Sequence, residues 1–234
     1  MIDKTNTLSK DIQEMVRVGA HFGFLRSRRH PSFKSLICGV KNMTEVIDLE
    51  KTEEMLKKAE EFVTELAKNK KTIMFVSSKS EAMGIVRQYA EGLSMPFVAS
   101  RWIGGTLTNF VEIKKRTHRL ADLVAKKEKG ELLKYTKKER LMFDREIDSL
   151  TAMFDGLKGV EKIPSAIFVV DAKKEHIAVA EAKQTGVTIV SLSSSDNDVK
   201  GVDYPIAAND ASKASIEFFV SRIAAAYKQG TLLA

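Results

Sequence analysis

Cysteine is almost absent from this sequence, and its scarcity excludes several kinds of site. The 234 residues contain a single cysteine, Cys38, which rules out an internal disulfide and any metal site built from several thiolates. A lone thiol can still act as a nucleophile. Because Cys38 lies in the apolar run 36–40 and a free cysteine behaves as a small hydrophobic residue, we expect a thiol packed in the core.

Long hydrophobic runs are also missing. The longest apolar stretches are only a few residues, and Asp3, Lys4 and Asp11 interrupt the N-terminal region. A helix that crosses a bilayer needs about 20 apolar residues, and a secretory signal needs an apolar centre. We therefore expect a cytoplasmic protein with no membrane partner.

The sequence lacks the motifs that hold nucleotide cofactors or metals. It has neither a dinucleotide glycine fingerprint nor the Gly-Lys-Ser or Gly-Lys-Thr end of a phosphate-binding loop. Its four histidines are scattered, with no pair at metal spacing. Asp171, Asp196 and Asp198 follow predicted strands, where they either hold a cation or cap turns. We predict no cofactor, no metal and no catalytic role.

Acidic residues are missing from one segment of an otherwise mixed chain. Residues 15–44 contain no Asp or Glu but carry six positive charges, and three phenylalanines, Phe22, Phe24 and Phe33, lie among them. The whole chain has a formal net charge of +7. Cations neutralise phosphates and aromatic rings stack on bases, so the segment predicts an RNA contact. The alternative is a solvated basic loop.

Alternating strand and helix patterns predict the fold. Apolar runs indicate strands at 72–77, 96–100, 165–171 and 187–192, with an edge strand at 202–206, and three-four spacing indicates helices at 50–69, 80–93 and 175–184. We predict an α/β protein with an open, mainly parallel sheet and helices on both faces, of Rossmann or flavodoxin-like type. A short helix beginning near Leu8 and ending at Gly19, a hairpin with strands 36–40 and 44–49, and a last helix capped by Asn209 or Asp210 and running to about Tyr227 complete the prediction.

A second pattern interrupts the core. Apolar residues at helical spacing continue from Phe110 to Val124 and resume from Phe143 to Phe154, with Gly130 between them and Thr117 as the one polar seam residue. This spacing predicts a protruding α-helical coiled-coil hairpin at 107–156, inserted in a core domain of residues 1–106 and 157–234. Its many bases alternate with acids, so we select only Lys114 and Lys115, near its root, as RNA contacts.

The decapeptide 101–110 connects a predicted strand to this hairpin. Gly104 and Gly105 permit a positive φ and a close approach of backbone. We expect Thr106 or Thr108 to cap the helix and the neighbouring amides to bind a phosphate oxygen. We expect Trp102 to anchor the turn while its arginine neighbour faces RNA. A tight turn around a buried tryptophan is the simpler alternative.

The candidate RNA-binding residues are those of the acid-free segment, the decapeptide and the hairpin root. They are Arg17, His21, Phe22, Arg26, Arg28, Arg29, His30, Lys34, Lys41, Arg101, Gly104, Gly105, Thr106, Asn109, Lys114 and Lys115.

Six blocks of sequence resemble the bacterial-type ribosomal protein S2 family. They are Gly19-Ala20-His21-Phe22-Gly23, residues 47–52, Phe75-Val76 with Lys79, the decapeptide 101–110, Leu141-Met142 with Arg145-Glu146, and residues 201–206. The resemblance implies a non-catalytic structural protein at the head-body junction of the small ribosomal subunit, bound to ribosomal RNA. It also implies neighbouring ribosomal proteins as partners, including the large protein that helps to hold messenger RNA. A nucleotide-dependent enzyme and an adaptor that binds proteins alone are the alternatives.

Overall fold

The core of the protein is a five-stranded parallel sheet. The structure is a computed structural model that describes residues 9–234, so Leu8 of the predicted first helix lies outside it. The strands are β4 (Ile73–Val76), β5 (Phe97–Val98), β6 (Ala166–Val170), β7 (Thr188–Ser193) and β8 (Tyr204–Ala207). Their order is β5-β4-β6-β7-β8 with every pair parallel, which confirms the predicted sheet. The order reverses between β4 and β6, the position where sheets of this kind usually bind ligands.

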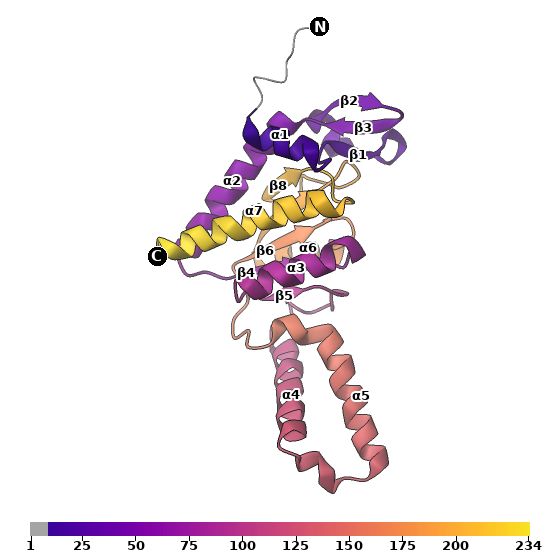
Figure 1. Ribbon diagram of the computed structural model, residues 1–234, viewed down its shortest axis with the longest axis vertical. Helices are drawn as coiled ribbons and strands as arrows, with labels where there is room; N and C mark the ends of the chain where they lie inside the picture. The colour runs from indigo at the N-terminus through magenta and orange to yellow at the C-terminus, as the bar shows by residue number, and fades with distance from the viewer. Residues whose placement is uncertain (1–8) are drawn as a thin grey trace.

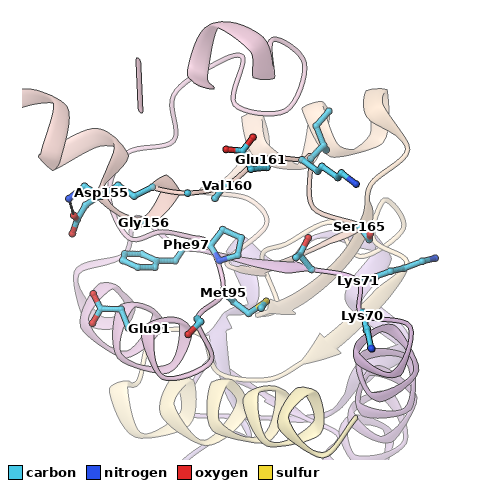
Figure 2. Close-up of a pocket in the computed structure, with 17 residues that line it drawn as sticks. Lys70, Lys71, Glu91, Met95, Phe97, Asp155, Gly156, Val160, Glu161 and Ser165 are labelled. Carbon is cyan, nitrogen blue, oxygen red and sulfur yellow. Dashed lines mark hydrogen bonds and ion pairs between the residues drawn. The ribbon is translucent and has the colours of Figure 1, made fainter. Parts of the chain in front are cut away.

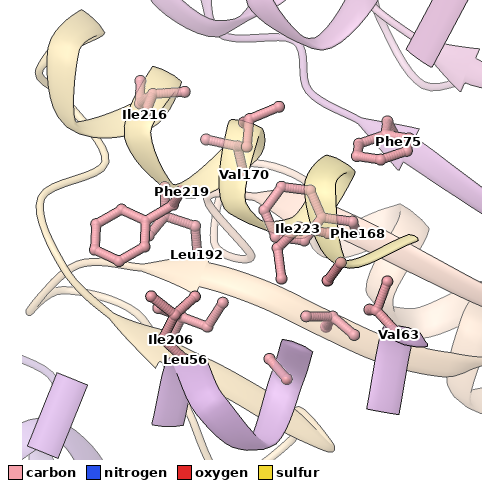
Figure 3. Packing of buried hydrophobic residues seen from close by; sticks show 14 of the residues in the cluster. Leu56, Val63, Phe75, Phe168, Val170, Leu192, Ile206, Ile216, Phe219 and Ile223 are labelled. Atoms are coloured by element: carbon pink, nitrogen blue, oxygen red, sulfur yellow. The ribbon is translucent and has the colours of Figure 1, made fainter. Parts of the chain in front are cut away.

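Helices cover both faces of the sheet because successive strand residues point to opposite sides. On one face, Phe75 and Phe168 pack against α1 (Lys10–Arg17), α2 (Leu49–Lys68), α3 (Ser80–Gly92) and α7 (Lys213–Leu232). Figure 3 shows this cluster, in which the α7 residues Phe219 and Ile223 lie over the strands. On the other face, Met74 and Ile167 pack against α6 (His176–Thr185) and the root of the hairpin.

A smaller sheet forms a layer of its own, which we call the N-terminal layer (residues 19–47). The strands β1 (Phe22–Leu25), β2 (Ile37–Lys41) and β3 (Thr44–Ile47) are antiparallel in the order β1-β3-β2. The 3₁₀ helices η2 (Arg26–Arg28) and η3 (Pro31–Leu36) connect β1 to β2. The predicted hairpin is confirmed as β2 and β3, whereas β1 was not predicted because its four residues lack the alternation of a half-buried strand.

The N-terminal layer covers the carboxyl ends of the large sheet's strands. The amide of Phe24 donates to Ser195 Oγ at 2.8 Å, and the amide of His30 donates to the Ser195 carbonyl at 2.9 Å. The amide of Asn209 donates to the carbonyl of Ala20 at 2.9 Å. These bonds tie the start of the chain to the loops that follow β7 and β8.

The hairpin consists of α4 (Phe110–Glu128), η4 (Glu131–Lys134) and α5 (Lys137–Phe154), followed by η5 (Asp155–Leu157). Figure 1 shows it projecting from the end of the molecule opposite to the N-terminal layer. Its buried residues are Ile113, Thr117, Leu120, Leu123, Leu132, Ile147, Leu150 and Phe154. These match the predicted seam, except that Phe110, Val124 and Phe143 are only partly buried and that Leu123 is buried. A supercoiled seam and an independent hairpin domain stay predictions.

Two predictions about Cys38 and the last helix are wrong. Cys38 is exposed, since it lies on β2 at the edge of the small sheet. Helix α7 begins after Ser212 and continues through Gly230 to Leu232. Asn209 forms a turn before it by accepting from the amides of Ala211 and Ser212 at 2.9 and 3.3 Å. A Cβ at Gly230 would lie 2.3 Å from the carbonyl oxygen of Thr64, so this glycine lets α7 approach α2 instead of ending the helix.

Candidate nucleic-acid interface

The acid-free segment presents a set of unpaired cations. Five of its six bases have exposed side chains and form no ion pair with any residue of 9–234, namely Arg17, Arg26, Arg28, Lys34 and Lys41. They come from α1, η2, η3 and β2. A charged group without a protein partner keeps its full charge for a phosphate, so the structure leaves these five predicted residues available to RNA.

Arg29 differs from the other five bases. Its Nη1 lies 3.1 Å from Oε1 of Glu45, a fully buried carboxylate on β3. Neither carboxylate oxygen of Glu45 has a hydrogen-bond partner among the described residues, so Arg29 supplies its neutralising charge. Glu45 directly follows the acid-free segment in the sequence. The pairing of β1 with β3 places its side chain beside Arg29.

The aromatic residues and histidines of the segment have separate roles. Phe33 is fully buried and belongs to a small core, whereas Phe22 is 47% exposed. The ring of His21 lies 4.0 Å from that of Phe22. Burial, and secondarily the charge of Lys41, lower the pKa of His21 and so favour the neutral imidazole. His30 begins η3, with its Nδ1 2.7 Å from Ser32 Oγ.

The decapeptide binds an anion, but the anion belongs to the protein itself. The carboxylate of Glu181, on α6, accepts hydrogen bonds from the amides of Gly105 at 2.7 Å, Leu107 at 2.9 Å and Thr108 at 3.2 Å. The indole Nε1 of Trp102 donates to it at 3.2 Å. Burial raises the pKa of Glu181, but these donors lower it by more, and the net shift is downward. The amides that we predicted to bind phosphate are therefore occupied.

The predicted cap of the hairpin helix is also wrong. Helix α4 begins after Asn109 without a side-chain cap. Thr106 is buried and donates to the carbonyl of Ile103 at 2.6 Å. Gly105 has a φ of +93°, a conformation that favours glycine. Sequence reasoning missed Glu181 because it lies more than seventy residues beyond the turn that it holds.

The remaining decapeptide and root residues divide into free and paired groups. Trp102 is buried, as predicted, while Arg101, Gly104 and Asn109 are exposed, and Arg101 has no ion pair within the described chain. Lys114 pairs with Glu161, and Lys115 pairs with Glu112 at 2.5 Å. The two root lysines selected from the sequence thus already have carboxylate partners.

The carboxyl edge of the large sheet, at the point where the strand order reverses, is occupied by the protein's own charges. Lys79, after β4, lies 2.7 Å from Asp171 Oδ2 and 3.0 Å from Asp210 Oδ1. Burial raises the pKa of Asp210 to about 7 although the charge of Lys79 opposes the rise. Glu175 accepts from the amide of Ser78 at 2.7 Å. These contacts fill the position where a doubly wound enzyme would hold its ligand.

The three aspartates considered as a cation site do not come together. Asp171 pairs with Lys79, Asp196 lies 3.0 Å from Lys173, and Asp198 lies 3.7 Å from His30 Nδ1. Within residues 9–234 no group of three or more carboxylates, histidines or thiols is arranged to hold a metal. No helix of this region is long and apolar enough to cross a bilayer.

The family model for ribosomal protein S2 matches residues 15–230 of the chain. The chain belongs to this family. Among its relatives is the small ribosomal subunit protein uS2 of Thermus thermophilus, 40% identical over 211 residues, which are 90% of this chain and 82% of the relative. The protein of the same name from Chloroflexus aggregans is 37% identical over 228 residues, 97% of this chain and 96% of the relative. The family match includes the N-terminal layer, the decapeptide and the hairpin.

Proposed function

We propose that this chain is a structural constituent of the small ribosomal subunit that binds ribosomal RNA through the exposed cations of the N-terminal layer and α1. The observation that carries the proposal is that five cations lie within thirty residues that contain no acid, and that none of the five has an ion-pair partner among residues 9–234. A solvated surface normally mixes charges of both signs. The relatives named as small ribosomal subunit proteins support the same role in the cytoplasm.

A non-catalytic role fits the carboxyl edge of the large sheet. The ion pairs of Lys79 and the covering N-terminal layer occupy the crevice that a nucleotide-dependent enzyme would need. Of the three aspartates considered as a cation site, two pair with lysines and the third lies beside a histidine. The function of this fold therefore depends on its surface and not on the crevice.

The N-terminal layer also supports docking of neighbouring ribosomal proteins. Phe22, Leu25, Val40 and Met43 are large apolar residues of this layer with between 47% and 78% of their surface exposed. Apolar groups beside unpaired cations suit a position where RNA and protein meet. The large protein that helps to hold messenger RNA is the neighbour that the family resemblance implies.

Cross-linking in the assembled particle tests the proposal. The full chain is added to small subunits that lack it, irradiated with ultraviolet light and digested, and the attached nucleotides and peptides are identified. We expect ribosomal RNA attached within residues 17–41. Partner proteins that bind equally well after the RNA is digested would support a protein-only adaptor instead, and a bound nucleotide that the purified chain turns over would support an enzyme.

A further inference from the structure

A pocket of about 690 Å³ opens at the amino edge of the large sheet, on the side opposite to the N-terminal layer. Its walls come from three segments that each lead into a strand: residues 70–72 before β4, 94–97 at β5, and 155–165 before β6. Figure 2 shows Phe97 and Met95 on one side of the pocket and Ser165 at its far end. None of the functional residues predicted from the sequence lines this pocket.

The acids of the pocket are neutralised within the protein. Asp155 accepts from Arg87 at 2.7 Å and from Lys158 at 2.6 Å. Glu91 accepts from Arg87 at 2.8 Å, and Glu161 pairs with Lys114. Each carboxylate of the lining therefore has a cation, and none repels an incoming anion at full strength.

Three lysines of the lining have no such partner. Lys70, Lys71 and Lys162 are exposed and form no ion pair with any residue that the structure describes. Lys70 and Lys71 lie at the end of the pocket away from Asp155 (Figure 2). The pocket thus has three uncompensated positive charges on two separate segments of its rim.

Apolar groups form the floor between these lysines. Met95 and Val160 are half-buried, Ile163 is 42% exposed, and the buried Phe97 also lines the pocket. A flat, partly apolar ligand with negative charge on its edges fits this combination, because bases pack on apolar side chains while phosphates are held by cations. The volume falls in the range of small-ligand pockets, about 300 to 1,000 Å³.

The walls of the pocket are held in place before any ligand arrives. The hydroxyl of Tyr227, on α7, donates to the carbonyl of Lys71 at 3.0 Å and orients the turn that carries two of the lysines. A Cβ at Gly156 would lie 2.2 Å from the carbonyl oxygen of Phe97, so η5 packs directly on β5. A site with fixed walls loses less entropy when it binds a ligand.

We propose that this pocket binds a single unpaired nucleotide of ribosomal RNA, with the base over the apolar floor and the neighbouring phosphates against Lys70, Lys71 and Lys162. A free nucleotide offers the same chemistry. RNA fits better, because the lysines stand on separate segments of the rim, where a strand that continues on both sides of the base would run. The inference rests on the proposed RNA-binding function and adds a second contact at the opposite edge of the sheet.

The test compares two triple variants of the full chain in binding to small subunits that lack it. K70Q/K71Q/K162Q removes the three unpaired pocket lysines, and K58Q/K213Q/K228Q removes three exposed lysines that pair with no acid in the described part of the chain and lie outside the pocket. In the first variant, the negative slope of log affinity against log salt should become shallower by roughly 2 to 3 units, at about 0.7 to 0.9 per lost phosphate contact. It should keep the parent value in the control. Equal slopes in the two variants would overturn the inference.

A second variant tests the base itself. Ile163→Ser makes the floor polar without changing the charge, so we expect a several-fold loss of affinity with the slope unchanged. Parent affinity in this variant would overturn the nucleotide pocket, even if the lysines contribute. Saturable binding of adenosine monophosphate to the free chain in equilibrium dialysis would overturn the inference in favour of a free nucleotide. Loss of a protein neighbour with the RNA cross-links intact would overturn it in favour of a protein partner. If the unaltered chain binds no RNA at all, the proposed function itself fails.

Discussion

The N-terminal layer and the helical hairpin are both rich in lysine and arginine, and they lie at opposite ends of the molecule (Figure 1). Along the hairpin, Arg119 pairs with Glu146 at 3.0 Å, and Lys126 and Lys127 each pair with an aspartate at 2.7 Å. Of the six bases in residues 15–44, only Arg29 pairs with an acid that the structure describes. Along the hairpin, five of the twelve bases in residues 107–156 pair with acids, so a larger share of the cations lacks a described carboxylate partner in residues 15–44 than in the hairpin.

The largest expected effect concerns the turn that joins the sheet to the hairpin. Trp102→Ala should lower the free energy of unfolding by about 3 to 5 kcal/mol, since it removes a buried ring and one donor to Glu181. Chemical denaturation measures the loss. Trp102→Phe should recover most of it, and Arg101→Ala should leave the melting temperature unchanged. A Trp102→Ala protein that melts like the parent but binds RNA poorly would make the ring a stacking surface.

The next effect separates Arg29 from its neighbours. Arg29→Gln should lower the free energy of unfolding by about 2 to 3 kcal/mol, because it leaves the Glu45 carboxylate buried without a charge partner. This is less than the 3 to 5 kcal/mol of a fully buried pair, because the Arg29 side chain is 25% exposed. The double variant R29Q/E45Q should regain stability. If R29Q instead melts normally and binds RNA less tightly, Arg29 belongs with the unpaired cations.

A third experiment compares the two basic regions directly through the salt dependence of RNA binding. R26Q/R28Q should reduce the slope of log affinity against log salt by roughly 1.4 to 1.8 units, at about 0.7 to 0.9 per phosphate. The matched hairpin variant K126Q/K127Q removes the same charge from residues that already pair with acids. It should keep the parent slope and change stability by about 1 kcal/mol or less. Equal changes of slope would remove the distinction between paired and unpaired cations.

The smallest effect is expected from shortening the hairpin. A short Gly-Ser bridge in place of residues 128–143 would join Lys127 to Asp144. The Nζ of Lys127 already lies 2.7 Å from Oδ1 of Asp144. The cut leaves the buried root residues Leu107, Phe154 and Leu157 with the sheet. We expect one cooperative melting transition near the parent temperature. Loss of cooperative melting would show that the outer hairpin stabilises the core.

The sequence predicted the features that depend on local periodicity. The parallel strands were found because strands covered on both faces are continuously apolar, and α2, α3 and α6 were found because their apolar residues recur every three or four positions. The buried position of Trp102 followed from the size and low polarity of its ring. Each of these features needs only neighbouring residues to specify it.

The features that were missed depend on residues far apart in the chain. The anion at the decapeptide is Glu181, and the partner of Arg29 is Glu45, which a strand pairing returns to it. Cys38 lies in an apolar run, but its exposure follows from the position of β2 at a sheet edge. Gly230 resembles a helix end until the approach of α2 is known. No window of local sequence contains this information.

The covering of the carboxyl edge has a consequence for the order of folding during synthesis. The N-terminal layer is anchored by Ser195 and Asn209, which are separated from their partners by 171 and 190 residues in the bonds to Phe24 and Gly19. Contacts of such long range form late because a large loop must close first. This basic segment leaves the ribosome well before Ser195 and Asn209, and it is therefore among the last parts of the chain to be anchored. Its arginines are therefore free to contact RNA before the chain has finished folding.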